Sequence, residues 1–328
     1  MEEFQGWIPY ESRDKESQKL TDEFHEQIGT FQTKGIFVQD IPKRFVWAEI
    51  EKFQLGHLLP RIWQRTGSCV GAGGWCAGNK TFFGDFLMGQ TEEALKPYFP
   101  WAPYGYGRRL GGLNRRGSGS FGPVQAKAMS DEGVGLLPFD DERFPQPKVR
   151  DDFWWYWTAD NELDWSTPRS WPVNESEMKR DGVKHGMQEW TKMESVDDIV
   201  QHTVQGRGIT LASSFGSRNM RVQHGLLVAT WNATWYHQMS YGGFAEDERG
   251  KRHHCIDNQW TKTAHPECPY LAKWGSNGSF WIDDDTMQRI CDRGEVYGFA
   301  NGGFTERNSF WEQVWTRYES ESGPQSAA

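Results

Sequence analysis

The stretch Leu59-Pro-Arg-Ile-Trp-Gln-Arg-Thr-Gly-Ser-Cys-Val-Gly-Ala-Gly-Gly-Trp-Cys-Ala-Gly-Asn79 decides the fold of this chain. Its first half has no regular period and closes with Gly67-Ser68, so we expect an irregular loop followed by a helix that begins at Cys69. A thiol at a helix N-terminus faces unpaired N–H groups and the positive end of the dipole, which favour the nucleophilic thiolate. The alternative is that Cys69 is a small buried hydrophobic residue, the commonest fate of a free cysteine.

A histidine and an asparagine follow far downstream, in the order that suits a cysteine nucleophile. We predict a strand over residues 236–244 that carries His237 and ends in a Gly-aromatic turn, with a partner strand over 255–260. The Asn258 side-chain carbonyl can accept the N–H of one imidazole nitrogen and leave the other nitrogen facing the sulfur. Trp260 would cover that hydrogen bond from water.

These motifs resemble the papain-like cysteine peptidases. The run from Gln64 to Cys69 is similar to the family's nucleophile loop, His237 with Gly243-Phe244 to its histidine strand, and Asn258-Gln259-Trp260 to its Asn-Ser-Trp motif. Two further segments fit the same order along the chain, Ile41–Trp47 at the start of the mature domain and Trp274–Gly278 for Trp-Gly-x-Asn-Gly.

The resemblance implies an α+β fold, in which a helical half and an antiparallel β-barrel-like half enclose a cleft. It also implies that Cys69 is the nucleophile, His237 the base, Asn258 the group that orients it and Gln64 an oxyanion donor. The substrate that the resemblance implies is a peptide or protein, and the reaction would need no cofactor and no metal.

Three positions depart from the family pattern. The family's oxyanion glutamine corresponds to Trp63, and Gln64 is displaced by one residue, so either the loop is one residue shorter and Gln64 still reaches the site or the side-chain donor is missing. Losing one such donor costs about a hundred- to a thousandfold in rate, so this position decides whether the protein is a good enzyme. The aromatic residue after the nucleophile is Val70, and a disulfide cysteine of the family is Thr66, which we interpret as a sign of a reducing compartment.

A glycine-rich segment is expected to line the substrate cleft. Gly119 to Ala126 is similar to the family stretch where bare backbone pairs with an extended peptide, which makes Gly119 and Ser120 candidate substrate-binding residues. Trp260 is a third candidate. The glycine-rich segment closes a predicted loop, 104–123, with four arginines among glycines. Such a loop also suggests a phosphate or nucleic-acid site, but its spacing matches no phosphate-binding fingerprint.

Composition narrows the function further. The 328 residues carry a net charge of −9, which does not favour nucleic acid or an anionic membrane as partner. With 18 Trp, 20 Phe and 10 Tyr, aromatic side chains are expected to build the core. The five cysteines cannot all pair, and no signal peptide or long apolar run is apparent. We therefore expect a cytoplasmic or virion-associated protein.

We expect four regions along the chain. Residues 1–40 form a polar extension, 41–195 the helical half, 196–318 the β half, and 319–328 a flexible tail. The extension suggests a solvated or loosely held segment, an inhibitory pro-segment by analogy with family relatives, or an arm that binds an assembly partner.

Several other features have alternative readings. The aromatic run at 153–157, with Trp165 and Trp171, is interpreted as packing rather than as a ligand platform. His224 is a rival base without the Gly-aromatic turn. The histidines and cysteines within 253–255 and 265–268 could hold zinc, but they lack a paired Cys-x-x-Cys knuckle. Regular elements are expected at 195–205 (helix) and at 208–216, 225–231 and 279–282 (strands), with a solvated turn at 283–285.

The sequence leaves three functional hypotheses. The first is a papain-like cysteine peptidase that works through a thioester. The second is a weakly active or inactive papain-fold component of an assembly, for example a phage virion. Acyl transfer or deamidation by the same residues is the third.

Overall fold

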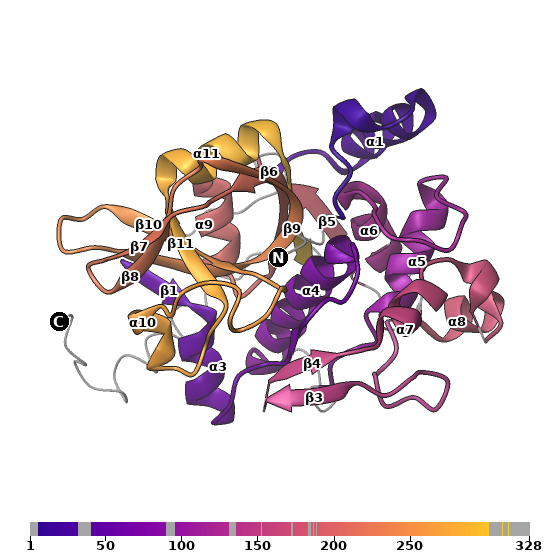
Figure 1. Cartoon of the computed structure of the whole chain (residues 1–328), viewed down its shortest axis with the longest axis horizontal. Coiled ribbons are helices and arrows are strands. Elements are labelled where there is room, and N and C mark those ends of the chain that lie inside the picture. The colour runs from indigo at the N-terminus through magenta and orange to yellow at the C-terminus, as the bar shows by residue number, and fades with distance from the viewer. Residues whose placement is uncertain are drawn as a thin grey trace.

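The protein is described by a computed structural model over residues 6–31, 41–89, 96–130, 136–151, 153–171, 173–182, 185, 187, 189–301, 310 and 314. The predicted tail 319–328 lies outside these residues, as does most of the segment after 301. Helix α4 (Cys69–Leu87) runs between a large sheet on one side and a group of shorter helices on the other (Figure 1). The two halves implied by the family resemblance are thus present on either side of the helix that Cys69 begins.

The β half is one mostly antiparallel sheet. Its strand order is β5-β12-β6-β9-β10-β11-β8-β7, with β1 also paired to β9, and β8 parallel to β11. β5 and β7 stand at its two ends in the described part of the chain, so the expected barrel does not close. The strands are β1 (Arg44–Val46), β5 (Glu189–Lys192), β6 (Ile209–Gly216), β7 (Met220–Gln223), β8 (Leu226–Ala229), β9 (Ala233–Glu246), β10 (Arg252–Asp257), β11 (Ser279–Asp283) and β12 (Glu295–Ala300).

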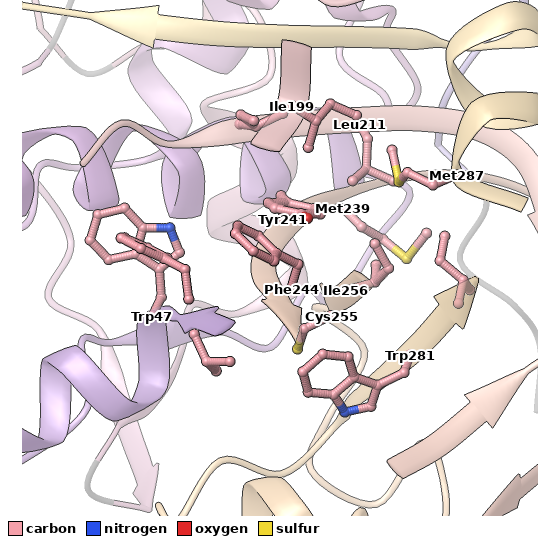
Figure 2. Close-up of a cluster of buried hydrophobic side chains, with 14 of the residues drawn as sticks. Trp47, Ile199, Leu211, Met239, Tyr241, Phe244, Cys255, Ile256, Trp281 and Met287 are labelled. Carbon is pink, nitrogen blue, oxygen red and sulfur yellow. The ribbon is translucent and has the colours of Figure 1, made fainter. Parts of the chain in front are cut away.

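Two capped helices cover this sheet. Ser195 starts α9 (Val196–Val204) with a capping box, which the predicted helix 195–205 anticipated. Asp283 caps α11 (Asp284–Arg293), so the solvated turn expected at 283–285 is instead a helix start. Between sheet and helices lies an apolar core that includes Ile199, Leu211, Met239, Tyr241, Phe244, Ile256 and Met287 (Figure 2).

The helical half combines short helices with a small sheet of order β2-β4-β3. The segment 104–123, which the sequence predicts to be a loop, begins within helix α5. Arg108 of this helix does not face solvent, because its guanidinium donates to the backbone carbonyls of Gly119, Arg115 and Ser166. The bounds are α3 (Trp47–Leu55), β2 (Arg61–Ile62), α5 (Trp101–Leu110), α6 (Gly122–Met129), β3 (Lys148–Asp151), β4 (Trp154–Tyr156), α7 (Ala159–Asp164), η2 (Pro168–Ser170), α8 (Glu175–Gly182) and α10 (Pro269–Ala272).

Aromatic side chains fill this half. Trp154, Trp157 and Trp165 are almost fully buried, and Phe99 stacks on Phe144 at 4.2 Å between ring centroids. The aromatic run is therefore largely packing, as interpreted from the sequence. No helix within the described residues is both long and apolar enough to cross a membrane.

Residues 6–31 of the N-terminal extension pack on the rest of the protein. It comprises a short turn η1 (Tyr10–Ser12) and helix α1 (Lys15–Ile28), which packs through Phe24 and Ile28. The charged residues expected to be solvated do line its outer face, but Arg13 is buried and paired with Glu295 of β12 at 2.5 Å. The extension is therefore attached to the body of the protein rather than loosely held.

Candidate functional site

Cys69 occupies the first position of α4 and is fully buried. The backbone N–H groups of Gln238, on β9, and of Gly6, in the N-terminal extension, face its thiol. Burial nevertheless raises the pKa of the Cys69 thiol to about 12, because these N–H groups only partly replace the lost water. In this conformation the thiol is neutral at pH 7, although the start of a helix favours the thiolate.

His237 and Asn258 meet beside this position. His237 lies on β9, next to Gln238, and its Nε2 donates to Asn258 Oδ1 at 2.8 Å directly after β10. The Trp260 ring stacks over the imidazole at 4.6 Å between centroids, as the sequence predicted for a covering residue. Burial lowers the pKa of His237 to about 4, although the hydrogen bond to Asn258 raises it.

The thiol and the imidazole are not hydrogen-bonded to each other. His237 Nδ1 is buried and has no hydrogen-bond partner among the side chains that the structure describes. Cys69, at the start of α4, and His237, on β9, are therefore two neutral groups, and the imidazole nitrogen that a general base would use has no hydrogen-bond partner in the described part of the chain.

Gln64 follows β2 and is fully buried. Its backbone N–H donates to Gln259 O at 3.0 Å, which joins the nucleophile loop to the Asn258–Trp260 segment. Its side-chain Nε2 donates to Thr66 O at 3.0 Å, within the nucleophile loop. The displaced glutamine is thus built into the loop that leads to Cys69.

Glu162 anchors the same loop from α7, a role that no sequence motif indicates. Its carboxylate accepts the N–H of Arg65 at 2.7 Å, both the N–H and the hydroxyl of Thr66 at 2.9 and 2.7 Å, and the Ser68 hydroxyl at 2.7 Å. Burial raises the pKa of Glu162 to about 7, because its effect is larger than that of the four hydrogen bonds, which lower the pKa. Thr66, which stands where the family has a disulfide cysteine, is held here by hydrogen bonds.

Residues 6–8 of the chain lie along Ser120. Ser120 N–H donates to Gly6 O and Ile8 N–H donates to Ser120 O, each at 2.8 Å, in a parallel bridge centred on Trp7. On the other side, Tyr236 O, one residue before His237, accepts the N–H groups of Gly6 and Trp7 at 3.1 Å. The extension therefore occupies backbone groups of Ser120 and Tyr236, which lie near Cys69 and His237.

Two features fix this segment in place. Trp7 is buried and its indole donates to Glu295 Oε2 at 2.7 Å. Gly6 approaches so closely that a Cβ at this residue would overlap the backbone of Gly67. Gly119, predicted to be a substrate-binding residue, donates its N–H to Gly67 O at 2.9 Å, and its carbonyl accepts from the Arg108 guanidinium.

The histidines of the other candidate sites have separate partners. His224 is exposed in the turn between β7 and β8, 4.0 Å from Glu248. His253 contacts Asp247, and His254 bridges Tyr241 and Asp284. Within the described ranges, His, Cys, Asp and Glu side chains form no group of three or more suited to a metal ion.

A buried group of four charges joins the two halves behind the site. Lys80 of α4 donates to Asp257 at 2.6 Å and to Tyr241 O at 2.5 Å, and Arg61 of β2 pairs with Asp257 and Glu51. Burial alone would raise the pKa of Asp257, but the two cations hold it at about 2. Asp257 directly precedes Asn258, so this network fixes the end of β10 against α4.

Comparison with solved structures identifies the fold. Xylellain, a cysteine protease from Xylella fastidiosa, is similar with a TM-score of 0.54 and 14% identity, over 91% of this chain and 96% of that one. The proform of the ragweed pollen cysteine protease Amb a 11 gives 0.49 at 12% identity, over 90% and 75% of the chains. Bromelain from Ananas comosus gives 0.48 at 11%, over 80% and 100%. No family model and no curated protein matches the sequence. The chain has the papain-like cysteine protease fold.

Proposed function

We propose that this protein is a cysteine peptidase that hydrolyses peptide bonds through Cys69, His237 and Asn258, and that residues 6–8 keep it latent. The observation that carries the proposal is the hydrogen bond from His237 to Asn258, covered by Trp260, at the start of the helix led by Cys69. A buried imidazole held by an amide oxygen on one nitrogen, with its other nitrogen unused beside a thiol, is the arrangement that nucleophilic cysteine chemistry requires.

The chemistry follows from these groups. His237 Nδ1 takes the proton of Cys69, and the sulfur attacks the amide carbonyl carbon to form a tetrahedral oxyanion. The N–H of Cys69, with the side chain of Gln64, stabilises the oxyanion, and His237 then protonates the leaving amine as the C–N bond breaks. Water deprotonated by His237 hydrolyses the thioester and returns the thiol.

Substrate would be an extended peptide or protein segment. The N–H and C=O of Ser120 and the C=O of Tyr236 are the backbone groups that would bind it, and Gly119 leaves room beside them. The extension pairs with Ser120 in the parallel direction, whereas a substrate peptide would pair with the same groups in the antiparallel direction. The extension therefore blocks these backbone groups with its chain running the opposite way.

Latency rests on the burial of both reactive groups. A neutral thiol with a pKa of about 12 beside an imidazole with a pKa of about 4 does not form an ion pair at pH 7. When residues 6–8 leave, water reaches the Cys69 thiol, and the burial that raises its pKa is reduced.

The test is a pair of substitutions assayed on peptide substrates. Gly6→Leu places a side chain where the Gly67 backbone lies, so the segment cannot stay and hydrolysis should rise. Gly117→Ala, whose added Cβ would have only ordinary contacts from 3.6 Å, is the matched control and should stay latent. Cys69→Ala in the Gly6→Leu background should abolish hydrolysis; activity that survives contradicts the assignment.

A second candidate is an inactive papain-fold component of an assembly, which the displaced glutamine favours. It predicts that Gly6→Leu exposes the cleft without producing hydrolysis. Acyl transfer or deamidation would appear in the same assay as Cys69-dependent product with a different acceptor.

A further inference from the structure

Asn258 uses both ends of its side-chain amide. Its Oδ1 accepts from His237 Nε2 at 2.8 Å, and its Nδ2 donates to His265 Nε2 at 2.7 Å. The three side chains form one hydrogen-bonded chain that runs from His265 through Asn258 to the imidazole beside Cys69. His265 comes from the segment between β10 and α10, where the sequence had suggested only a weak zinc site.

The surroundings of His265 hold its ring and keep it neutral. The ring stacks on Trp235 of β9 at 5.9 Å between centroids with an interplanar angle of 17°, and contacts Phe280 of β11 edge-on at 5.1 Å. Burial lowers the pKa of His265 to about 4, and the imidazole of His237 is the titratable side chain that faces it through Asn258. A neutral ring can accept a hydrogen bond at Nε2, whereas an imidazolium cannot.

The orientation of the Asn258 amide determines which nitrogen of His237 can act as a base. A primary amide fits its site in two orientations, and only one places the carbonyl oxygen toward His237. When the neutral ring of His265 carries its proton on Nδ1, its Nε2 is an acceptor and selects that orientation, because the reversed amide would then set two acceptors against each other. With Oδ1 toward His237, the proton of the neutral imidazole stays on Nε2 and Nδ1 remains able to take the thiol proton.

We infer that His265 is a positioning residue: by accepting from Asn258 Nδ2 it fixes the amide of Asn258 and, through it, the tautomer of His237. The inference rests on the proposed function for its catalytic meaning, but the hydrogen-bond chain is testable without any turnover.

The first measurement is nuclear magnetic resonance of the full-length protein with ¹⁵N-labelled histidine and asparagine, and His237→Ala assigns the His237 signals. We expect a scalar coupling between Asn258 Nδ2 and His265 Nε2 across the N–H···N bond, and a His237 ring protonated at Nε2. No coupling in the wild-type protein, or a His237 ring protonated at Nδ1, would overturn the inference without touching the assignment of Cys69.

Two variants complete the test. His265→Phe keeps an aromatic ring against Trp235 but removes the acceptor, so the His237 signals should move toward the Nδ1-protonated form. His265→Gln returns an acceptor oxygen and should restore them. In the Gly6→Leu background kcat should fall about tenfold in His265→Phe with KM unchanged, the effect of one neutral hydrogen bond. An unchanged tautomer in His265→Phe contradicts the inference.

Discussion

Cys69 and His237 have pKa values shifted in opposite directions by the same cause. Burial raises the pKa of the thiol to about 12 and lowers that of the imidazole to about 4, because the charged form of each loses water. The helix dipole at Cys69 opposes only part of this effect, since the contribution of a helix end is small compared with full desolvation. The state of the site is therefore set by what covers it.

His237 and His265 predict a loss of stability in mild acid. The pKa values of His237 and His265 are about 4 when folded, against 6.5 ordinarily, so the unfolded chain binds more protons between these limits. Stability is therefore full above pH 6.5 and falls as the pH drops toward 4, by about 2 kcal/mol per histidine between pH 7 and pH 5. Urea unfolding at both pH values measures this, and His265→Phe should reduce the difference by its share; an equal difference contradicts the pKa assignment.

Glu162 gives a prediction for the nucleophile loop. Glu162→Gln leaves one acceptor oxygen where four donors of Arg65, Thr66 and Ser68 converge, so at least one buried donor loses its partner. We expect a loss of about 1–3 kcal/mol in the free energy of unfolding, measured by chemical denaturation. Asp164→Asn, on the same helix but in a half-exposed pair with Arg116, is the control and should change little. Equal stability of the two variants would contradict the anchoring role.

Helix α4 packs against backbone, which its glycines permit. A Cβ at Gly84 would overlap the carbonyl of Gly206, and a Cβ at Gly208 would overlap that of Ala77, so helix and β half meet without intervening side chains. This contact helps to fix Cys69 relative to β9, because α4 begins at Cys69 and packs against β9 and β6.

Gly84→Ala tests this contact by the sign of its effect. Replacing glycine with alanine inside an exposed helix stabilises by about 1 kcal/mol, but here we expect a loss of about 1–3 kcal/mol from overpacking. Thermal or chemical unfolding measures the difference, with Gly117→Ala, where the added Cβ meets only ordinary contacts, as a control. A stabilised Gly84→Ala protein would mean that α4 does not touch the Gly206 backbone.

Elements with a clear period could be predicted, and those shaped by tertiary contacts could not. The helix at 195–205 and the strands at 208–216 and 225–231 agree with α9, β6 and β8. Helix α5 was expected to be a loop because Gly105 and Gly107 disfavour helix, yet both glycines are needed where the helix meets the backbone of Trp165 and Val124. At these two positions, close backbone packing outweighs the low helix propensity of glycine.

At the scale of the molecule, two cations from the helical side meet two carboxylates in the interior. Lys80→Met would leave Asp257 and Glu51 to share Arg61, and we expect a loss of about 3–5 kcal/mol because one cation no longer compensates both buried carboxyl groups. Lys96→Met, which breaks a surface pair with Asp140, is the control and should change stability little. Comparable losses in the two variants, measured by denaturant unfolding, would contradict the linking role of the buried group.

The candidate site was predictable where its residues sit in local motifs. His237, Asn258 and Trp260 come together as expected, because strand pairing of β9 with β10 follows from their sequence patterns. Glu162, His265 and the Gly6–Trp7 segment had no such signal, since each acts through contacts that depend on the folded path of a distant segment. The catalytic roles themselves remain predictions that the experiments above address.

The most direct measurement is the rate of Cys69 alkylation by iodoacetamide as a function of pH, read by mass spectrometry with Cys76 as internal reference. In the full-length protein labelling of Cys69 should be as slow as that of Cys76, since burial raises both pKa values. In Gly6→Leu it should rise by roughly a thousandfold at pH 7, as the thiol returns to an ordinary pKa or below, and fall again when His237→Ala is added. Equally slow labelling in Gly6→Leu and in the wild-type protein would contradict a latent thiol–imidazole pair under the N-terminal segment.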